Sequence, residues 1–154
     1  MNKIIKNTVI LTLITLIAGI CLGAVYEITK EPIAQAQDAA KKEAWQQVFP
    51  DADANDFELI DVDQKAADKA IKDLGVKATI DEVCTVGEEG YVVTVTDKEG
   101  YGGDIKITVG ITADGTINGI SILSITETAG LGMRATEPAF YEQYQGKQAE
   151  KFVV

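Results

Sequence analysis

The stretch ATIDEVCTVGEEGYVVTVTDKEGYGGDIKITVGITADGTINGISILS, residues 78–124, decides the fold of this chain. Apolar and β-branched residues alternate with polar ones, which is the two-residue period of strands in a half-buried sheet. The connectors are short and contain glycine, so neighbouring strands form hairpins and the sheet is antiparallel. The strands are predicted at Thr79–Val86, Tyr91–Thr96, Asp104–Ile111 and Thr116–Leu123.

Helical patterns flank this block of strands on both sides. Before it, Phe57–Val62 predicts a short strand, and Lys65–Leu74 predicts a helix that Gly75 closes in the left-handed conformation. After it, Thr136-Glu137-Pro138 predicts a helix start, and Gly146 predicts its end. Helices and strands that are segregated in this way are typical of the α+β class, not of a doubly wound α/β sheet.

The carboxy-terminal residues predict one more strand. Lys151–Val154 opens an apolar run at which the sequence stops, without a turn or a polar tail. We therefore expect the domain to lack its carboxy-terminal part.

The amino-terminal residues predict a membrane anchor. Residues 7–26 carry no charge, and 20 helical residues span about 30 Å, the thickness of the hydrocarbon core. Lys3 and Lys6 precede this run, and Glu27 follows it. By the positive-inside rule the amino terminus is cytoplasmic, and the rest of the chain is exported. The chain is thus predicted to be a single-pass protein of a bacterial or archaeal cytoplasmic membrane.

Two other interpretations of the same segment stay open. A cleaved signal peptide would have a shorter apolar region and a small-x-small site, of which Leu22-Gly23-Ala24 is a weak version. Lipidation at Cys21 would require a small residue before it, where Ile20 stands. An uncleaved anchor explains the length of the run better than either alternative.

A connector helix is predicted between the anchor and the domain. Thr29–Pro32 carries helix-start residues, apolar side chains then recur at helical spacing as far as Val48, and Pro50 stops the run. Trp45 lies on this pattern and is predicted to be a packing residue. The chain is accordingly divided into an anchor at 1–27, a connector at 28–50 and a domain at 51–154.

Composition excludes several classes of function. The net charge of −10 and a pI near 4.4 disfavour binding to a phosphate backbone, so no nucleic acid is expected as a partner. The chain has no histidine, which excludes imidazole catalysis, and its single arginine is Arg134. Cys21 and Cys84 are interpreted as unpaired thiols.

No metal site is expected in the acidic segment at 51–63. Asp51, Asp53 and Asp56 suggest calcium ligands, but the EF-hand loop needs glycine at its sixth position and glutamate at its twelfth. Here those positions hold Asp56 and Val62. The segment is interpreted as a solvated loop.

Two glycine clusters exceed what hairpin turns require. Gly100-Tyr101-Gly102-Gly103 precedes one predicted strand, and Gly130-Leu131-Gly132 follows another, after Thr126-Glu127-Thr128. Glycine serves where the backbone takes a positive φ or where another group approaches closely. Neither cluster matches a phosphate loop or a dinucleotide fingerprint.

Together these motifs resemble the G subunit of the Rnf ion-translocating electron-transport complex, in the FMN-binding domain family. They are also similar to a relative of that protein, the C subunit of the Na⁺-translocating NADH:quinone reductase. The resemblance rests on the anchor, on Gly100–Ile105 running into Val109-Gly110-Ile111, on Asp114–Ile117 and on Thr126–Gly132. The family pattern in the last stretch is E-T-P-G-L-G, so Ala129 replaces a proline. The shorter stretch before the glycine motifs favours the Rnf protein over the quinone-reductase protein.

The resemblance implies a membrane-anchored subunit that relays electrons through FMN inside a ferredoxin:NAD oxidoreductase, alongside other Rnf membrane subunits. It implies no catalytic residue in this chain, because the cofactor carries the redox chemistry. It implies that the flavin lies against these residues: Tyr101, Gly102, Glu127, Thr128, Gly130, Leu131 and Gly132. Glu127 is interpreted either as a flavin hydrogen-bond acceptor or as a cap for the amides of its own loop.

One departure from the family pattern is large. The family attaches FMN to a threonine in an S-G-A-T motif, and none occurs in these 154 residues. We expect that threonine beyond Val154; the alternative is that the chain is a variant without covalent flavin. The rival hypothesis from another class is a non-catalytic, membrane-anchored extracytoplasmic binding domain.

Overall fold

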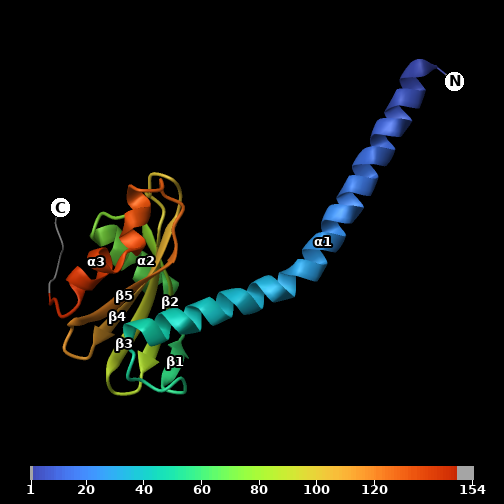
Figure 1. The fold of residues 1–154 in the computed structure, drawn as a ribbon. Helices are drawn as coiled ribbons and strands as arrows, with labels where there is room; N and C mark the ends of the chain where they lie inside the picture. Colours follow the sequence, from blue (N-terminus) through green and yellow to red (C-terminus); the bar gives the residue numbers. More distant parts are fainter. Residues whose placement is uncertain (1, 149–154) are drawn as a thin grey trace. The chain divides into compact units, whose positions relative to one another are not determined.

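The computed structural model describes residues 2–148, so the strand predicted at 151–154 lies outside the described residues. Contacts divide the chain into two compact units, residues 1–39 and 40–154. The elements are labelled in Figure 1, apart from the 3₁₀ helices η1 and η2. Their bounds are α1 Lys3–Val48, β1 Phe57–Ile60, α2 Gln64–Asp73, β2 Ala78–Val86, β3 Gly90–Asp97, β4 Ile105–Thr112, β5 Ile117–Ser124, η1 Gly132–Thr136, α3 Pro138–Tyr141 and η2 Glu142–Tyr144.

The first unit is helical and apolar. Within the described part of the chain, α1 is the one helix long and apolar enough to cross a membrane. Its most apolar stretch of 18 residues is not buried against the rest of the protein. The hydroxyl of Thr8 donates to the Ile4 carbonyl at 3.0 Å, and that of Thr15 donates to Leu11 at 3.1 Å. These bonds satisfy the polar side chains inside the helix itself. The unit fits a single-pass membrane anchor.

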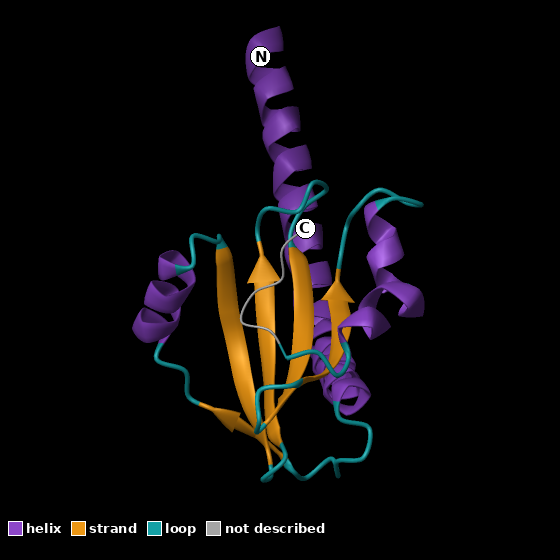
Figure 2. Ribbon diagram, turned by 90° about the vertical axis from the view of Figure 1, so that its left-hand side faces the viewer, coloured by secondary structure: helices purple, strands orange, loops and turns teal. Residues whose placement is uncertain are grey.

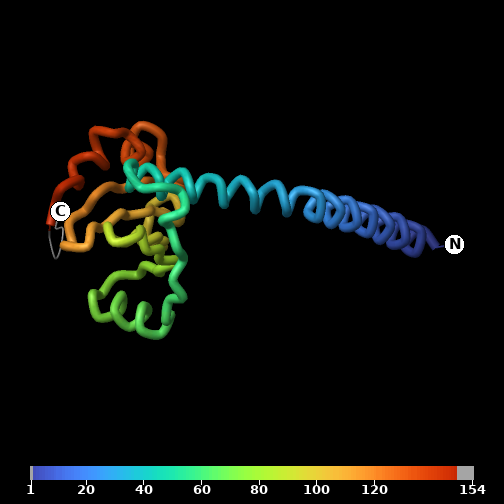
Figure 3. Tube along the Cα trace, turned by 90° about the horizontal axis from the view of Figure 1, so that it is seen from below, coloured from blue at the N-terminus to red at the C-terminus, as the bar shows by residue number. Residues whose placement is uncertain are grey.

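The predicted helix start at Thr29–Pro32 is wrong. α1 runs through Pro32 without a break and ends at Val48, and the reader can trace it along the tube in Figure 3. Proline inside a helix removes one backbone hydrogen bond and crowds the preceding turn, at a cost of about 3 kcal/mol. The helix continues on both sides of this proline over 46 residues, and the side chain of Thr29 donates to the Val25 carbonyl at 2.8 Å. The division into anchor, connector and domain stays a prediction.

The second unit is built on a five-stranded antiparallel sheet in the order β1-β2-β3-β4-β5. The four predicted strands and their hairpin connections are confirmed, each within one residue at either end. The predicted short strand is confirmed as β1, which ends two residues early at Ile60. The α+β class is also confirmed, because helices and strands are segregated along the chain.

Two helical segments flank the sheet, as Figure 2 shows. Asp63 is the N-cap of α2, and its carboxylate accepts from the amides of Lys65 and Ala66. After the C-cap residue Leu74 comes Gly75 at φ 73°. This confirms the predicted helix and its glycine stop. At the other flank, α3 begins with Pro138, η2 follows directly, and Gly146 has φ 72°. The ring centroids of Phe140 and Tyr144 lie 5.9 Å apart in this segment.

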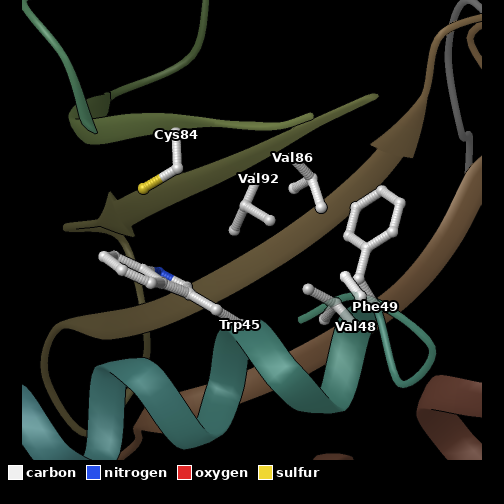
Figure 4. Packing of buried hydrophobic residues seen from close by; sticks show 7 residues of the cluster. Trp45, Val48, Phe49, Cys84, Val86 and Val92 are labelled. Carbon is white, nitrogen blue, oxygen red and sulfur yellow. The ribbon is translucent and has the colours of Figure 1, made fainter. Parts of the chain in front are cut away.

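The last turns of α1 pack on one face of the sheet and form the hydrophobic core (Figure 4). Trp45 is 7% exposed and stacks on Phe57 with 5.8 Å between ring centroids, which confirms it as a packing residue. A Cβ placed on Gly110 would lie 2.9 Å from the Cβ of Val48, so the helix approaches the sheet closely there. The core comprises Trp45, Val48, Phe49, Ala52, Cys84, Val86 and Val92.

Polar bonds fix the register of this helix end on the sheet. The Asn118 amide donates to the Val48 carbonyl at 2.6 Å, and the Ser121 hydroxyl donates to Gln47 at 2.7 Å. Val48 is the last residue of α1, so its carbonyl has no partner within the helix. The sheet therefore completes the end of the helix.

A pH-dependent loss of stability is expected from Cys84. Burial, with a smaller contribution from Glu82, raises the pKa of this thiol from 9.0 to about 11. The folded state thus holds a proton that the unfolded chain releases near pH 9, and the resulting stabilisation disappears as the pH rises from 9 to 11. A two-unit shift corresponds to about 3 kcal/mol. Denaturant unfolding at pH 8 and at pH 10.5 checks this.

The matched variant for that experiment is Cys84→Ala. It is less stable at pH 8, because it leaves a small cavity, but it lacks the buried thiol. Its stability is therefore expected to fall less between the two pH values than that of the parent. Equal falls in both proteins would contradict the assignment.

Candidate functional site

The two glycine clusters meet at one end of the sheet. Gly100–Gly103 leads into β4, and Thr126–Gly132 follows β5. β4 and β5 pair antiparallel with Lys106 opposite Ser124, so the start of one lies beside the end of the other. The hairpin register thus brings the two clusters together. Gly102 and Glu127, which are in contact, lie 25 residues apart in the sequence.

Two hydrogen bonds hold the clusters together through the backbone of Gly102. The amide of Gly102 donates to Oε1 of Glu127 at 3.0 Å, and the hydroxyl of Thr126 donates to the carbonyl of Gly102 at 3.2 Å. Charge-assisted bonds such as the first are stronger than bonds between neutral groups. Glu127 therefore caps an amide of the neighbouring loop, whereas the structural alternative given above had it cap amides of its own loop.

The glycines at this contact are required by packing. A Cβ on Gly132 would lie 2.6 Å from the Cβ of Glu127, and one on Gly100 would lie 2.9 Å from Oε1 of the same side chain. Gly103 has φ 145°, and its Cβ would lie 2.6 Å from the Thr126 hydroxyl. A Cβ on Gly102 would collide with the Thr126 carbonyl. These four positions are thus occupied by contacts within the protein.

Gly130 differs from these four glycines. Its φ is 75°, and a Cβ placed on it would meet nothing within 4 Å. The adjoining Leu131 is 72% exposed, although its amide is bonded to the Thr128 carbonyl at 3.1 Å. The loop therefore presents an open backbone position and an unburied leucine side by side.

A cavity of about 400 Å³ lies beside Gly130 and Leu131. It falls within the usual range for sites that hold a small molecule or cofactor. Phe140 adds an aromatic surface to Leu131, and Gln143 supplies an amide that both donates and accepts hydrogen bonds. Its lining is completed by Arg134, Glu137 and Ala139.

A second, almost entirely apolar cavity of about 350 Å³ lies next to the first. It is lined by residues of β4, β5 and the segment α3–η2, and Phe140 lines both cavities. Its other lining residues are Ile107, Val109, Ile117, Ile120, Ile122, Tyr141 and Tyr144.

The predicted site residues fall into three groups. Gly130 and Leu131 line the first cavity, and the Thr128 carbonyl shapes the loop by accepting from the amides of Leu131 and Met133. Gly102, Glu127 and Gly132 hold the two loops together. Tyr101 is 95% exposed and is not among the residues that line the cavity.

Sequence reasoning missed five lining residues as parts of the site: Arg134, Glu137, Ala139, Phe140 and Gln143. Their common signal is position, because all follow the second glycine cluster within η1, α3 and η2 or at their junction. Glu137, Phe140 and Gln143 also recur every three residues, so they share one side of short helical turns. Such spacing indicates a shared surface but does not show that the surface faces the glycine loop.

The residues present fit a flavin. The isoalloxazine is a flat ring system with apolar faces and a polar edge, and this cavity combines an aliphatic side chain, an aromatic side chain and a few polar groups. The missing Cβ at Gly130 leaves the backbone accessible from the cavity side. The fit concerns the Gly130–Leu131 side of the loop only, since Gly100–Gly103 is closed against Thr126 and Glu127.

Comparison with known proteins identifies the class of this domain. Residues 100–153 match the family described as the FMN-binding domain, and residues 1–48 match the RnfG N-terminal region. The domain is thus of the FMN-binding class and is joined to an apolar helix of the RnfG type.

The matched relatives are the G subunits of ion-translocating complexes. That of the proton-translocating ferredoxin:NAD(+) oxidoreductase complex of Clostridium ljungdahlii is 33% identical, covering 99% of this chain and 74% of that protein. The G subunit of the Na(+)-translocating ferredoxin:NAD(+) oxidoreductase complex of Acetobacterium woodii is 31% identical, over 98% of this chain and 73% of that protein. That of the ion-translocating oxidoreductase complex of Methanosarcina acetivorans is 30% identical over 93% and 73%. This chain belongs to the RnfG family, the G subunits of Rnf complexes.

Removal of the Glu127 side chain is expected to loosen the two loops. Glu127→Ala leaves the Gly102 amide without its carboxylate partner, which costs roughly 1–2 kcal/mol. Glu127→Gln keeps an acceptor oxygen and is expected to lose less. Thermal unfolding, together with hydrogen exchange at the Gly102 amide, measures both effects.

The matched control is Glu88→Ala, which removes an exposed glutamate from the β2–β3 turn. It is expected to leave both the unfolding midpoint and the Gly102 exchange rate unchanged. An unaltered Gly102 exchange rate in Glu127→Ala would disprove the bridging role.

Proposed function

We propose that this chain is the membrane-anchored, FMN-carrying electron-transfer subunit of an Rnf-type ion-translocating oxidoreductase complex. The observation that carries the proposal is the open cavity beside Gly130 and Leu131, within the segment that matches the FMN-binding domain family. The amino-terminal match to the RnfG region over the apolar helix supports the anchored position. Other subunits of such a complex are its partners.

Each residue around the cavity has a role that follows from its place. Leu131 and Phe140 offer apolar contact to the faces of the ring, and the open backbone at Gly130 allows close approach. Glu127 keeps the loop in shape through its bond to Gly102 and does not itself line the cavity. When bound, FMN supplies one- and two-electron redox chemistry, while the protein orients it and sets its electrostatic surroundings.

The proposal extends to the mode of attachment and to topology. FMN is joined through a phosphoester to a threonine that is not among these 154 residues. The domain lies on the extracytoplasmic side, because Lys3 and Lys6 keep the amino terminus in the cytoplasm. Residues 7–26 contact the lipid bilayer.

Flavin content of the full-length protein, matured in its native host, tests the function. The expected result is a yellow protein that fluoresces in the gel under denaturing conditions and releases FMN only on chemical cleavage. A protein without bound flavin would overturn the function, and flavin lost on denaturation would overturn covalent attachment alone.

A reporter fused after Gln148 tests the orientation. Alkaline phosphatase, which folds in the periplasm, is expected to be active there, and exchanging Lys3 and Lys6 for glutamate is expected to lower that activity. An active cytoplasmic reporter at the same position would place the domain on the opposite side.

A further inference from the structure

Arg134 holds a particular place in this chain. It is the only arginine in the sequence, and it lies in η1, two residues after the second glycine cluster. Its amide donates to the Leu131 carbonyl at 3.0 Å, so the backbone couples it to the residue that opens the cavity. Arg134 lines that cavity together with Gly130 and Leu131.

The guanidinium of Arg134 forms only a weak ion pair, with Glu137. Its Nε lies 3.5 Å from Oε1 of Glu137, and the two side chains are 68% and 52% exposed. An ion pair that is long and solvated to this extent contributes little to stability. The guanidinium can therefore turn toward another acceptor at small cost, and its planar set of donors suits the oxygen and nitrogen acceptors at the edge of a heterocycle.

The surroundings make a single cation matter. The chain carries a net charge of −10, which disfavours negative charge added to a bound group. Of the described residues that line the cavity, Arg134 is the only cation and Glu137 the only anion. Any negative charge that develops on a ring beside Leu131 is thus stabilised or destabilised chiefly by these two side chains.

We propose that Arg134 faces the bound flavin and stabilises the negative charge that the ring acquires on reduction, with Glu137 opposing it. The inference rests on the proposed function of the same cavity. Two electrons and one proton convert the neutral ring into a singly negative reduced form, and a cation beside the ring favours that form. Arg134 thereby raises the reduction potential of this flavin, and Glu137 lowers it.

Redox titration of the flavin-loaded, full-length protein tests this. The electrons come from an electrode through soluble mediators, so the measurement does not depend on the activity of the complex. Arg134→Gln is expected to shift the ratio of reduced to oxidised flavin at a given potential about tenfold toward the oxidised form, which is about 30 mV for a two-electron couple. Arg134→Lys keeps the charge and is expected to stay near the parent.

Two further variants distinguish charge from structure. Glu137→Gln removes the opposing anion and is expected to raise the potential, a change of opposite sign that a merely structural role for the pair would not produce. Lys72→Gln removes a positive charge from the last turn of α2, outside the cavity lining, and controls for net charge. It is expected to leave the potential unchanged.

Each outcome of these titrations supports or overturns the role proposed for Arg134. Equal potentials for the parent and Arg134→Gln would overturn the inference, as would shifts of the same sign in Arg134→Gln and Glu137→Gln. If Arg134→Gln lost its flavin while Arg134→Lys kept it, the requirement for a cation would be supported by binding; loss from both would overturn it. A parent protein without flavin would refute the proposed function itself, and the inference would fall with it.

Discussion

Gly110→Val is expected to destabilise the second unit by about 3 kcal/mol, because it drives a branched side chain into the end of α1. A Cβ at this position would lie 2.9 Å from the Cβ of Val48, 3.0 Å from its carbonyl oxygen and 3.0 Å from the ring of Phe49. Val48 is fully buried and Phe49 is 3% exposed, and side chains in protein interiors are closely packed. Relief must come from lifting the helix end off the sheet.

The effect can be followed through the single tryptophan. Trp45 lies in the turn that would move, so its emission reports directly on this contact. We expect a lower midpoint of thermal unfolding in the detergent-solubilised full chain and red-shifted emission before unfolding.

Gly119→Ala provides the graded comparison. Its Cβ would lie 3.1 Å from the Cα of Val48, slightly farther than the contacts at Gly110, and it adds one methyl group. We expect a loss of about 1 kcal/mol, below that of Gly110→Val. If Gly110→Val had no more effect than Gly119→Ala, the close approach of helix and sheet would be incorrect.

The sheet was accessible from sequence because its signal is local and repeated. β-branched residues alternate through β2 to β5, and glycine-containing connectors are short enough to allow only hairpins. The helix stop after α2 was equally local, since Gly75 has the left-handed φ that a helix end requires.

The long helix was not predicted because the proline rule considers one position at a time. Pro32 costs the helix one hydrogen bond, whereas the turns on either side of it are retained within a helix of 46 residues. A local breaker therefore does not end a segment whose neighbours favour continuation.

Only part of the candidate site could be predicted from the sequence, for a related reason. The glycine clusters stand out by composition, yet four of their glycines serve the contact between the loops and only Gly130 is left open. The β4–β5 register decides which glycines pack between the loops and which one stays open, and the sequence of a single cluster does not encode this register. Arg134 and Phe140 reach the cavity from η1 and α3, whose placement is a tertiary property.

Gly130→Val is expected to lower the flavin content of the full-length protein at least tenfold. The substitution places a branched side chain on the backbone that borders the cavity proposed to hold the ring. It also imposes a φ of 75° on a β-branched residue, which costs about 1–2 kcal/mol whether or not a cofactor binds. These two effects have to be separated.

Gly75→Val separates them. Gly75 has φ 73°, and a Cβ on it would likewise meet nothing within 4 Å, so the two positions share the same strain and the same free space. They differ in location, since Gly75 follows α2 and is absent from the lining of the cavity. We expect equal shifts in thermal unfolding from the two variants and a loss of flavin from Gly130→Val alone. Equal flavin content in both would mean that the ring does not lie against Gly130, because identical backbone strain would then account for everything observed.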